Sequence, residues 1–408
     1  MGIASNQLRI ARDLWTRLQP IDRALPARLQ SLLADRRFGS RDRRLYRELL
    51  FTALRQARVL ASLPPDDENA WALRVASACA RGRETEAVRA AFAASELPPP
   101  DPLELTPAWF ASECDTGRPA AETAAALLSR APVWIRLQVD DPAEAEAEWA
   151  ARGWSAEPHP VLPEARKLPP ETNVSACVSY QKGHYEVQDL GSQLILASLD
   201  LPARSPGPRW LDACAGAGGK TLQLARLLGP ASRVDATDVR PAALAELRTR
   251  AARAGLGSRI RTLPRPDLAA LYDGVLVDAP CSGSGTWRRA PHLMACTSET
   301  DLAAAARLQT EILRNAAGRV RPGGLLVYAT CSITRTENRA VAETFLSGQA
   351  GLFQEEPPAH DFGFPRIGPG LAITPGKHDN DGFYVAVFRR ASCVRQVQQK
   401  RLYGSVIG

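Results

Sequence analysis

The chain has 408 residues, of which 45% are hydrophobic and 23% charged, so it is long enough for two or three domains of an ordinary globular protein. Its formal net charge of +7 favours an anionic partner, and a nucleic acid more than a membrane surface. The sequence contains no apolar run of the roughly twenty residues that a membrane span needs, and its first residues lack the apolar core of a signal peptide. The eight cysteines show no CxxC spacing, which argues against a zinc site and a disulfide scaffold. We therefore expect a monomeric, cytoplasmic protein without a metal or a membrane contact.

The N-terminal part of the chain is expected to be helical. Between Gln7 and about Arg130, apolar residues recur every three or four positions, which predicts a helical domain over residues 1–130. Residues 1–60 contain thirteen arginines against five acidic residues. Six of these arginines form a dense run that either binds phosphates or is a solvated helix face, and the sequence supports both interpretations equally. They are Arg36, Arg37, Arg41, Arg43, Arg44 and Arg47.

The character of the sequence changes near Pro132. Val133–Leu137 is predicted to be a strand and Ala143–Arg152 a short helix, and a proline-rich stretch follows between Glu157 and Pro170. This pattern predicts a small α+β connector over residues 131–180.

Strand and helix patterns alternate after Pro208, which predicts a third domain over residues 181–392 and a tail over 393–408. Such alternation indicates an α/β fold with a doubly wound, mostly parallel sheet. A late strand, Gly382–Phe388, is expected at the sheet edge as a hairpin partner. The predicted helices are Thr221–Leu228, one that begins at Pro241, and Thr300–Val320, which is expected to end at Arg321–Gly324. The predicted parallel strands are Arg209–Ala213, Arg233–Asp238, Ser258–Leu263, Tyr272–Ala279 and Leu325–Thr330.

A glycine-rich turn follows the first of these strands and opens a helix, as in nucleotide-binding sites. Asp238 lies about twenty residues further on, where an acid would accept hydrogen bonds from ribose hydroxyls. The turn does not match the dinucleotide pattern GxGxxG, because Gly219 stands where that pattern has an ordinary residue. It does not match the P-loop pattern GxxxxGK(S/T) either, because that pattern needs a glycine at the position of Cys214. We therefore favour S-adenosylmethionine over NAD as the ligand. The expected binding residues of the turn are Cys214, Ala215, Gly216, Ala217, Gly218, Gly219 and Lys220.

Cys281 and Cys331 each follow an apolar strand, and Asp278 precedes Cys281 by three residues. A thiolate that adds to C6 of cytosine makes C5 nucleophilic enough to accept a methyl group, after which a base must remove the C5 proton. The ends of neighbouring parallel strands meet at one edge of a sheet, so a thiol, an acid and a methyl donor could converge there. The pattern favours carbon methylation of a pyrimidine over the simpler interpretation, in which both cysteines are buried apolar thiols.

Five runs of sequence resemble the motifs of the RsmB/NSUN family of RNA cytosine-C5 methyltransferases. The resemblance implies a Rossmann-like class I methyltransferase domain in which Cys331 is the nucleophile and Cys281 assists release of the covalent adduct. It also implies that Asp278 faces both the base and the donor. Ala217 replaces a proline common in the family, and Asp267 is the candidate for the adenine-side contact. The runs are Tyr185–Gln193, Asp212–Lys220, Asp278–Gly283, Ala329–Ser332 and Pro375–Tyr384.

Residues 34–58 resemble the NusB-type helical domain that some members of that family carry, which implies an RNA-binding platform. Ribosomal RNA is therefore the expected substrate, with transfer RNA second. Trp287 and the two arginines after it could hold the RNA backbone, or Trp287 could belong to the core. A DNA cytosine-C5 methyltransferase, with Cys281 as nucleophile, and a non-catalytic RNA-binding or assembly protein remain as alternatives.

Overall fold

The computed structural model describes residues 2–64, 67–170, 172–201, 207–267 and 269–392, so the expected tail lies outside the described residues. The first part of the chain is helical, as the apolar spacing predicts. Leucines of α1 and α3 point inward and pack with Trp71 of α5 around one core, because their spacing places them on one face of each helix. The helices are α1 (Ile3–Arg17), α2 (Leu25–Leu33), α3 (Ser40–Arg55), α4 (Ala57–Ala61), α5 (Glu68–Ala78), α6 (Glu86–Phe92), η1 (Ala93–Ser95), α7 (Pro102–Leu105), α8 (Phe110–Glu113) and α9 (Ala120–Leu128).

A small antiparallel sheet with strand order β2-β3-β1-β4 follows the helices. The last strand of this sheet, β4, lies beyond residue 180, the expected end of the connector, and pairs with β1 in the register Ile135↔Val187. Trp149 of α10 is fully buried against this sheet. The elements are β1 (Val133–Leu137), α10 (Ala143–Ala151), β2 (Glu157–Pro158), β3 (Ala165–Leu168), η2 (Val174–Ala176), α11 (Val178–Gln181) and β4 (Tyr185–Val187).

The large sheet has the order β11-β12-β13-β9-β8-β5-β6-β7, and β10 pairs with β13. The five strands from β9 to β7 are parallel, which confirms the predicted α/β fold with a mostly parallel sheet. Strand order reverses around β5, so the glycine turn lies at the point where such sheets bind ligands. The strands are β5 (Arg209–Asp212), β6 (Arg233–Thr237), β7 (Ile260–Leu263), β8 (Tyr272–Asp278), β9 (Val320–Thr330), β10 (Phe353–Glu356), β11 (Arg366–Ile367), β12 (Gly370–Ile373) and β13 (Phe383–Arg390).

Two expectations about the C-terminal half are wrong. The late strand β13 does not lie at the edge, because it pairs with β12 on one side and with β9 on the other. Residues Arg321–Gly324 do not form a turn after the long helix, but belong to β9. Pairing with β8 extends to Tyr272↔Val320, and a register shift between Tyr272 and Gly274 accommodates the proline and glycines.

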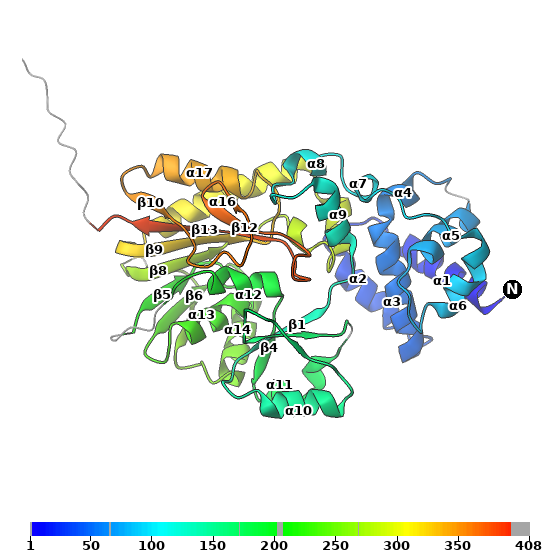
Figure 1. Ribbon diagram of the computed structural model, residues 1–408, viewed down its shortest axis with the longest axis horizontal. Helices are drawn as coiled ribbons and strands as arrows, with labels where there is room; N and C mark the ends of the chain where they lie inside the picture. Colours follow the sequence, from blue (N-terminus) through cyan, green and yellow to red (C-terminus); the bar gives the residue numbers. More distant parts are fainter. Residues whose placement is uncertain (1, 65–66, 171, 202–206, 268, 393–408) are drawn as a thin grey trace, which may run out of the picture.

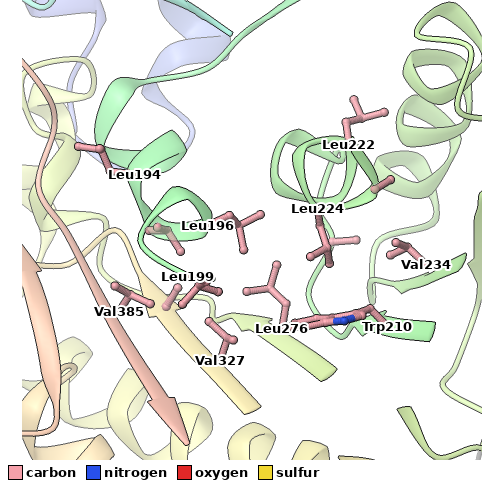
Figure 2. Packing of buried hydrophobic residues seen from close by; sticks show 14 of the residues in the cluster. Leu194, Leu196, Leu199, Trp210, Leu222, Leu224, Val234, Leu276, Val327 and Val385 are labelled. Atoms are coloured by element: carbon pink, nitrogen blue, oxygen red, sulfur yellow. The ribbon is translucent and has the colours of Figure 1, made fainter. Parts of the chain in front are cut away.

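Helices cover both faces of the large sheet (Figure 1). One face carries α16 and α17, and the other carries α12, α13 and α14. Figure 2 shows leucines of α12 and α13 packed on Trp210, Leu276 and Val327 of the strands. The helices are α12 (Leu190–Ala197), α13 (Gly219–Leu227), α14 (Pro241–Arg253), η3 (Ser284–Thr286), α15 (Pro291–Cys296), α16 (Glu299–Ala317) and α17 (Arg339–Gly348).

The carboxyl ends of the parallel strands face the N-terminal helices. In Figure 1 the arrowhead of β13 points away from the helical domain, and β9 runs antiparallel to β13. The loops that follow β8 and β9 therefore lie between the sheet and the helical domain. Among the residues that the structure describes, no helix combines the length and the apolar character that a membrane crossing requires.

Substitution of Gly274 by alanine tests the packing of the central strands. A Cβ atom at this position would lie 2.3 Å from Cε2 of Trp210, whose side chain is buried. We expect Gly274→Ala to lower the free energy of unfolding by about 1–3 kcal/mol, measured by urea denaturation. Gly348→Ala in α17 is the matched control, because its Cβ would meet no atom within 4 Å. Equal stability of the two variants would contradict this packing.

Candidate active site

The two cysteines lie side by side. Cys281 follows β8 and Cys331 follows β9, and these strands are parallel neighbours in the register Asp278↔Ala329. The Sγ atoms are 3.3 Å apart, and both residues are partly exposed. The strand pairing thus brings together two thiols that are separated by 50 positions in the sequence.

The fully buried carboxylate of Glu337 ties the two cysteine loops together. From the Cys281 loop it accepts hydrogen bonds from the backbone N of Ser282 at 2.8 Å and from its Oγ at 2.5 Å. From the Cys331 loop it accepts bonds from Oγ of Ser332 at 2.6 Å and Oγ1 of Thr334 at 3.1 Å. A fifth donor is Nε2 of Gln309 at 3.1 Å. No cation of the described residues is paired with Glu337, and these donors compensate the cost of burying its charge.

The surroundings of Cys281, including the charge of Glu337, favour its neutral form. The pKa of Cys281 is raised well above its ordinary value by the hydrogen bond with Cys331, by burial, and by the negative charges of Cys331 and Glu337. All of these favour the neutral thiol of Cys281. Sequence reasoning missed Glu337, although a Glu-Asn pair six residues after Cys331, next to a buried strand, was a hint.

Backbone contacts fix the loops further. The N–H of Gly285 donates to the carbonyl O of Cys331 at 2.9 Å, and a Cβ at position 285 would lie 2.0 Å from the carbonyl O of Gly382. The end of the helical domain also holds the Cys331 loop, because Asp115 N donates to Ile333 O at 3.0 Å and Arg335 N to Glu113 O at 2.8 Å. The helical domain is therefore hydrogen-bonded directly to the cysteine loop.

Lys220 joins the glycine turn to Asp278. Its Nζ lies 2.8 Å from Oδ2 of Asp278, and the lysine side chain is only 9% exposed. Burial opposes the charge of Lys220, but the carboxylate of Asp278 raises the pKa of this lysine, and Cys331 and Asp212 contribute in the same direction. The pair places one positive charge close to Cys331 and leaves Oδ1 of Asp278 for another partner.

The glycine turn has the geometry of a ligand site. Gly216 and Gly218 adopt positive φ angles of 53° and 91°, and a Cβ at Gly219 would meet no atom within 4 Å, so the backbone is open there. Asp238 follows β6 beside the turn, where its Oδ2 accepts the N–H of Gly216 at 2.8 Å. Nε of Arg240 donates a hydrogen bond to Oδ1 of Asp238 at 3.0 Å. The side chain of Arg240 is 68% exposed, so it can move aside for a ribose. The turn, its following helix and Asp238 therefore fit S-adenosylmethionine.

Two arginines that the sequence did not single out support the turn from behind. Nη2 of the buried Arg136 donates to the carbonyl O of Gly219 at 3.3 Å, and Nη1 of Arg250 donates to that of Ala217 at 2.7 Å. Arg250 is in turn paired with the buried Glu186 at 2.9 Å. Both Arg136 and Glu186 belong to the small sheet, which thereby orients the turn.

Asp212 is a further residue that sequence reasoning left without a role. It is 1% exposed at the end of β5 and accepts the hydroxyl of Thr221 at 2.7 Å and the N–H of Cys214 at 3.3 Å. Burial raises the pKa of Asp212 to about 7, and the charge of Asp278 adds to the effect while the Thr221 hydrogen bond opposes it. Asp212 therefore shapes the turn and titrates near neutral pH.

The remaining predicted residues lie apart from this centre. Asp267 is exposed in the loop after β7, where its Oδ1 accepts the N–H of Ala269 at 3.0 Å. Trp287 is 1% exposed and packs edge-on against Trp109, with ring centroids 5.9 Å apart. Trp287 thus belongs to the core, which was one of its two expected interpretations, and its buried side chain does not hold an RNA backbone.

The titration of Asp212 predicts a pH dependence of stability. Its pKa of about 7 in the folded state exceeds its ordinary value of 3.8, so the folded chain binds more protons than the unfolded chain between these values. The contribution of Asp212 to stability is therefore present below pH 3.8 and is lost as the pH rises through about 7. We expect the stability advantage of wild type over Asp212→Asn to fall over this window, by up to about 1.4 kcal/mol per pH unit. Urea denaturation at several pH values, with Asp267→Asn as an exposed control, measures it, and a constant difference would contradict the assignment.

Glu337→Gln tests whether this carboxylate controls Cys281. The change removes a negative charge, which lowers the pKa of a nearby thiol. In a Cys331→Ala background, we expect alkylation of Cys281 by iodoacetamide to occur at lower pH when Glu337 is replaced, as mass spectrometry can follow. Glu343→Gln, an exposed carboxylate on α17, should leave the alkylation profile unchanged. Identical profiles with and without Glu337 would disprove its electrostatic role.

Comparison with known proteins places the chain in a family. A family model described as 16S rRNA methyltransferase RsmB/F matches residues 201–389. Ribosomal RNA small subunit methyltransferase B of Xylella fastidiosa is 35% identical over 289 residues, which are 69% of this chain and 66% of that protein. The proteins of the same name from Xanthomonas campestris and Klebsiella pneumoniae are 34% and 31% identical, over 70% and 74% of this chain and 67% and 69% of theirs. The chain thus spans about two thirds of the length of these relatives.

Solved structures share the fold. PH0851 superposes with a TM-score of 0.74 at 22% identity over 95% of this chain and 99% of its own. A methyltransferase homologue from Pyrococcus horikoshii gives a TM-score of 0.57 at 25% identity, over 66% of this chain and 90% of its own. NSun6 from the same organism, solved with SFG, gives 0.59 at 18% identity, over 66% and 95%. The resemblance seen in the sequence motifs is confirmed, and the chain belongs to the RsmB/F family of 16S rRNA methyltransferases.

Proposed function

We propose that this chain is an S-adenosylmethionine-dependent RNA (cytosine-C5)-methyltransferase that acts on small-subunit ribosomal RNA through a covalent adduct between Cys331 and cytosine C6. The observation that carries the proposal is the pair of thiols 3.3 Å apart in unequal electrostatic surroundings. Cys331 has the ammonium group of Lys220 nearby, whereas Cys281 has the carboxylate of Glu337.

The cofactor supplies an electrophilic methyl group. Residues 214–220, from Cys214 to Lys220, are the groups that hold it, together with Asp238. Because the turn, Asp278 and Cys331 follow β5, β8 and β9, which are consecutive in the sheet, donor and substrate meet at one edge. Asp267 remains a candidate for the contact with the adenine of the cofactor.

Cys331 attacks C6 of the cytosine as a thiolate, with the ammonium group of Lys220 nearby. Oδ2 of Asp278 is held by Lys220, and its other oxygen accepts a hydrogen bond from the exocyclic amino group of the base. With the cofactor bound, the electron pair released at C5 would form the bond to its methyl carbon while the bond between that carbon and the sulfonium sulfur breaks, and the sulfur would keep the electrons of the broken bond as a neutral thioether.

Release requires loss of the C5 proton and cleavage of the Cys331–C6 bond. Cys281 mediates both events: its thiol proton passes to Cys331, which departs with the electrons of the broken bond, and the Cys281 thiolate that results takes the C5 proton. The separation of 3.3 Å permits the first transfer, and the raised pKa of Cys281 makes its thiolate a strong base for the second.

The same electrostatics argues against the alternatives. A DNA-type mechanism needs Cys281 as a thiolate nucleophile, yet its hydrogen bond, its burial and Glu337 all favour its neutral form. A non-catalytic binding protein would have no use for a buried carboxylate that joins two cysteine loops. Relatives named for ribosomal RNA support that substrate over transfer RNA.

Replacement of each cysteine separates their roles. We expect Cys331→Ala to abolish methyl transfer from labelled S-adenosylmethionine to unmodified small-subunit ribosomal RNA. We expect Cys281→Ala to accumulate a protein–RNA adduct that survives denaturing electrophoresis, because the C5 proton can no longer leave.

Cys296→Ala is the matched control, because Cys296 lies in α15 outside the cysteine pair, and it should keep wild-type activity. An adduct that depends on Cys281 and forms without Cys331 would reverse the assignment. A wild-type protein that transfers no methyl group to any RNA would refute the enzymatic proposal.

A further inference from the structure

A cleft of about 250 Å³ lies between the helical domain and the catalytic domain. One wall is α3, another is the segment Arg130–Val133 that leaves the helical domain, and the third is the loop that continues from Cys281. A water molecule in the liquid occupies about 30 Å³, so the cleft is several times larger than one water molecule and has room for a phosphate group. The basic residues that line it are Arg47, Arg55, Arg130, Arg288 and Arg289, and Glu48 is the acidic one.

Three of these arginines already have carboxylate partners. Arg130 lies 3.6 Å from Glu48, and the buried Arg288 lies 2.5 Å from Asp379. Arg289 is paired with Asp189 and Asp381, both at 2.7 Å. These pairs neutralise three positive charges and fix the loop that forms one wall.

Arg47 and Arg55 remain without a carboxylate. Within the described part of the chain, neither makes an ion pair, and Nε of Arg55 is buried without a hydrogen-bond partner. The guanidinium of Arg55 lies over the Phe51 ring at 6.0 Å, and burial lowers the pKa of Arg55, with Glu48 opposing and Arg130 and Arg288 adding to the decrease. A partly buried guanidinium with two other cations nearby is stabilised when a further anion joins it.

We infer that this cleft binds a backbone phosphate of the RNA substrate, held by Arg47 and Arg55 of α3 against the loop that carries Cys281. The inference rests on the proposed function and names a place where that substrate is gripped. Planar guanidinium groups suit bidentate contact with phosphate oxygens. Because Arg288 and Arg289 follow Cys281 by seven and eight positions, a phosphate bound here lies on the same loop as the reaction centre.

The location agrees with the arrangement of the domains. The carboxyl ends of the parallel strands face the helical domain in Figure 1, so RNA that enters the active site passes this junction. Of the arginines in the run 36–47, only Arg47 lines the cleft, so we expect its contribution to RNA binding to differ from that of its neighbours.

The test compares RNA affinity in full-length variants over a series of salt concentrations. The probe is small-subunit ribosomal RNA transcribed in vitro. We expect Arg47→Ala and Arg55→Ala each to weaken binding about three- to tenfold, and to reduce the slope of log affinity against log salt by about 0.7, the value for one lost phosphate contact on a single strand. Arg47 is exposed, so its replacement does not endanger folding, and Arg55→Lys, which keeps the charge, should restore most of the affinity.

Arg41→Ala is the matched control, because Arg41 is exposed on the same helix but does not line the cleft. Equal losses for Arg41→Ala and Arg47→Ala, or wild-type affinity in both cleft variants, would overturn the inference. If wild type binds RNA but transfers no methyl group, the proposed function is refuted. The comparison of RNA affinities between the variants would still test whether the cleft binds RNA.

Discussion

A single buried carboxylate, Glu337, determines the geometry on which the chemistry depends. It accepts five hydrogen bonds, from both cysteine loops and from Gln309, and so fixes the two sulfurs at 3.3 Å. Its charge also adds to the rise in the pKa of Cys281 that the hydrogen bond with Cys331 and burial cause. One group thereby holds the two cysteine loops together and disfavours the charged form of Cys281.

The other parts of the molecule build on this centre. Strand order places the glycine turn, Asp278 and Cys331 at consecutive strand ends, and Lys220 links the first to the second. The small sheet supports the turn through Arg136, and the helical domain holds the Cys331 loop through its backbone. The small sheet and the helical domain are therefore both joined to the reaction centre by hydrogen bonds.

The sequence predicted what depends on local patterns. Alternating strands and helices, a glycine turn and polar strand ends were enough for the fold class and for the convergence of Cys281 with Cys331. It did not predict Glu337 or the Lys220–Asp278 pair and left two interpretations of Trp287 open, because these features depend on contacts between segments that are distant in the chain. The extent of β9 was missed because Pro322 and its glycines form an irregularity within the strand, between the paired residues Val320 and Leu325.

The most direct test of the account asks which sulfur bonds to the base. Wild-type protein is incubated with S-adenosylmethionine and RNA in which 5-fluorocytidine replaces cytidine, so that the methylated adduct cannot lose a C5 proton and persists. Proteolysis and mass spectrometry then identify the peptide linked to RNA. The account predicts that this peptide carries Cys331. A linked peptide that carries Cys281, or methyl transfer to natural RNA without any adduct on the fluorinated RNA, would contradict it.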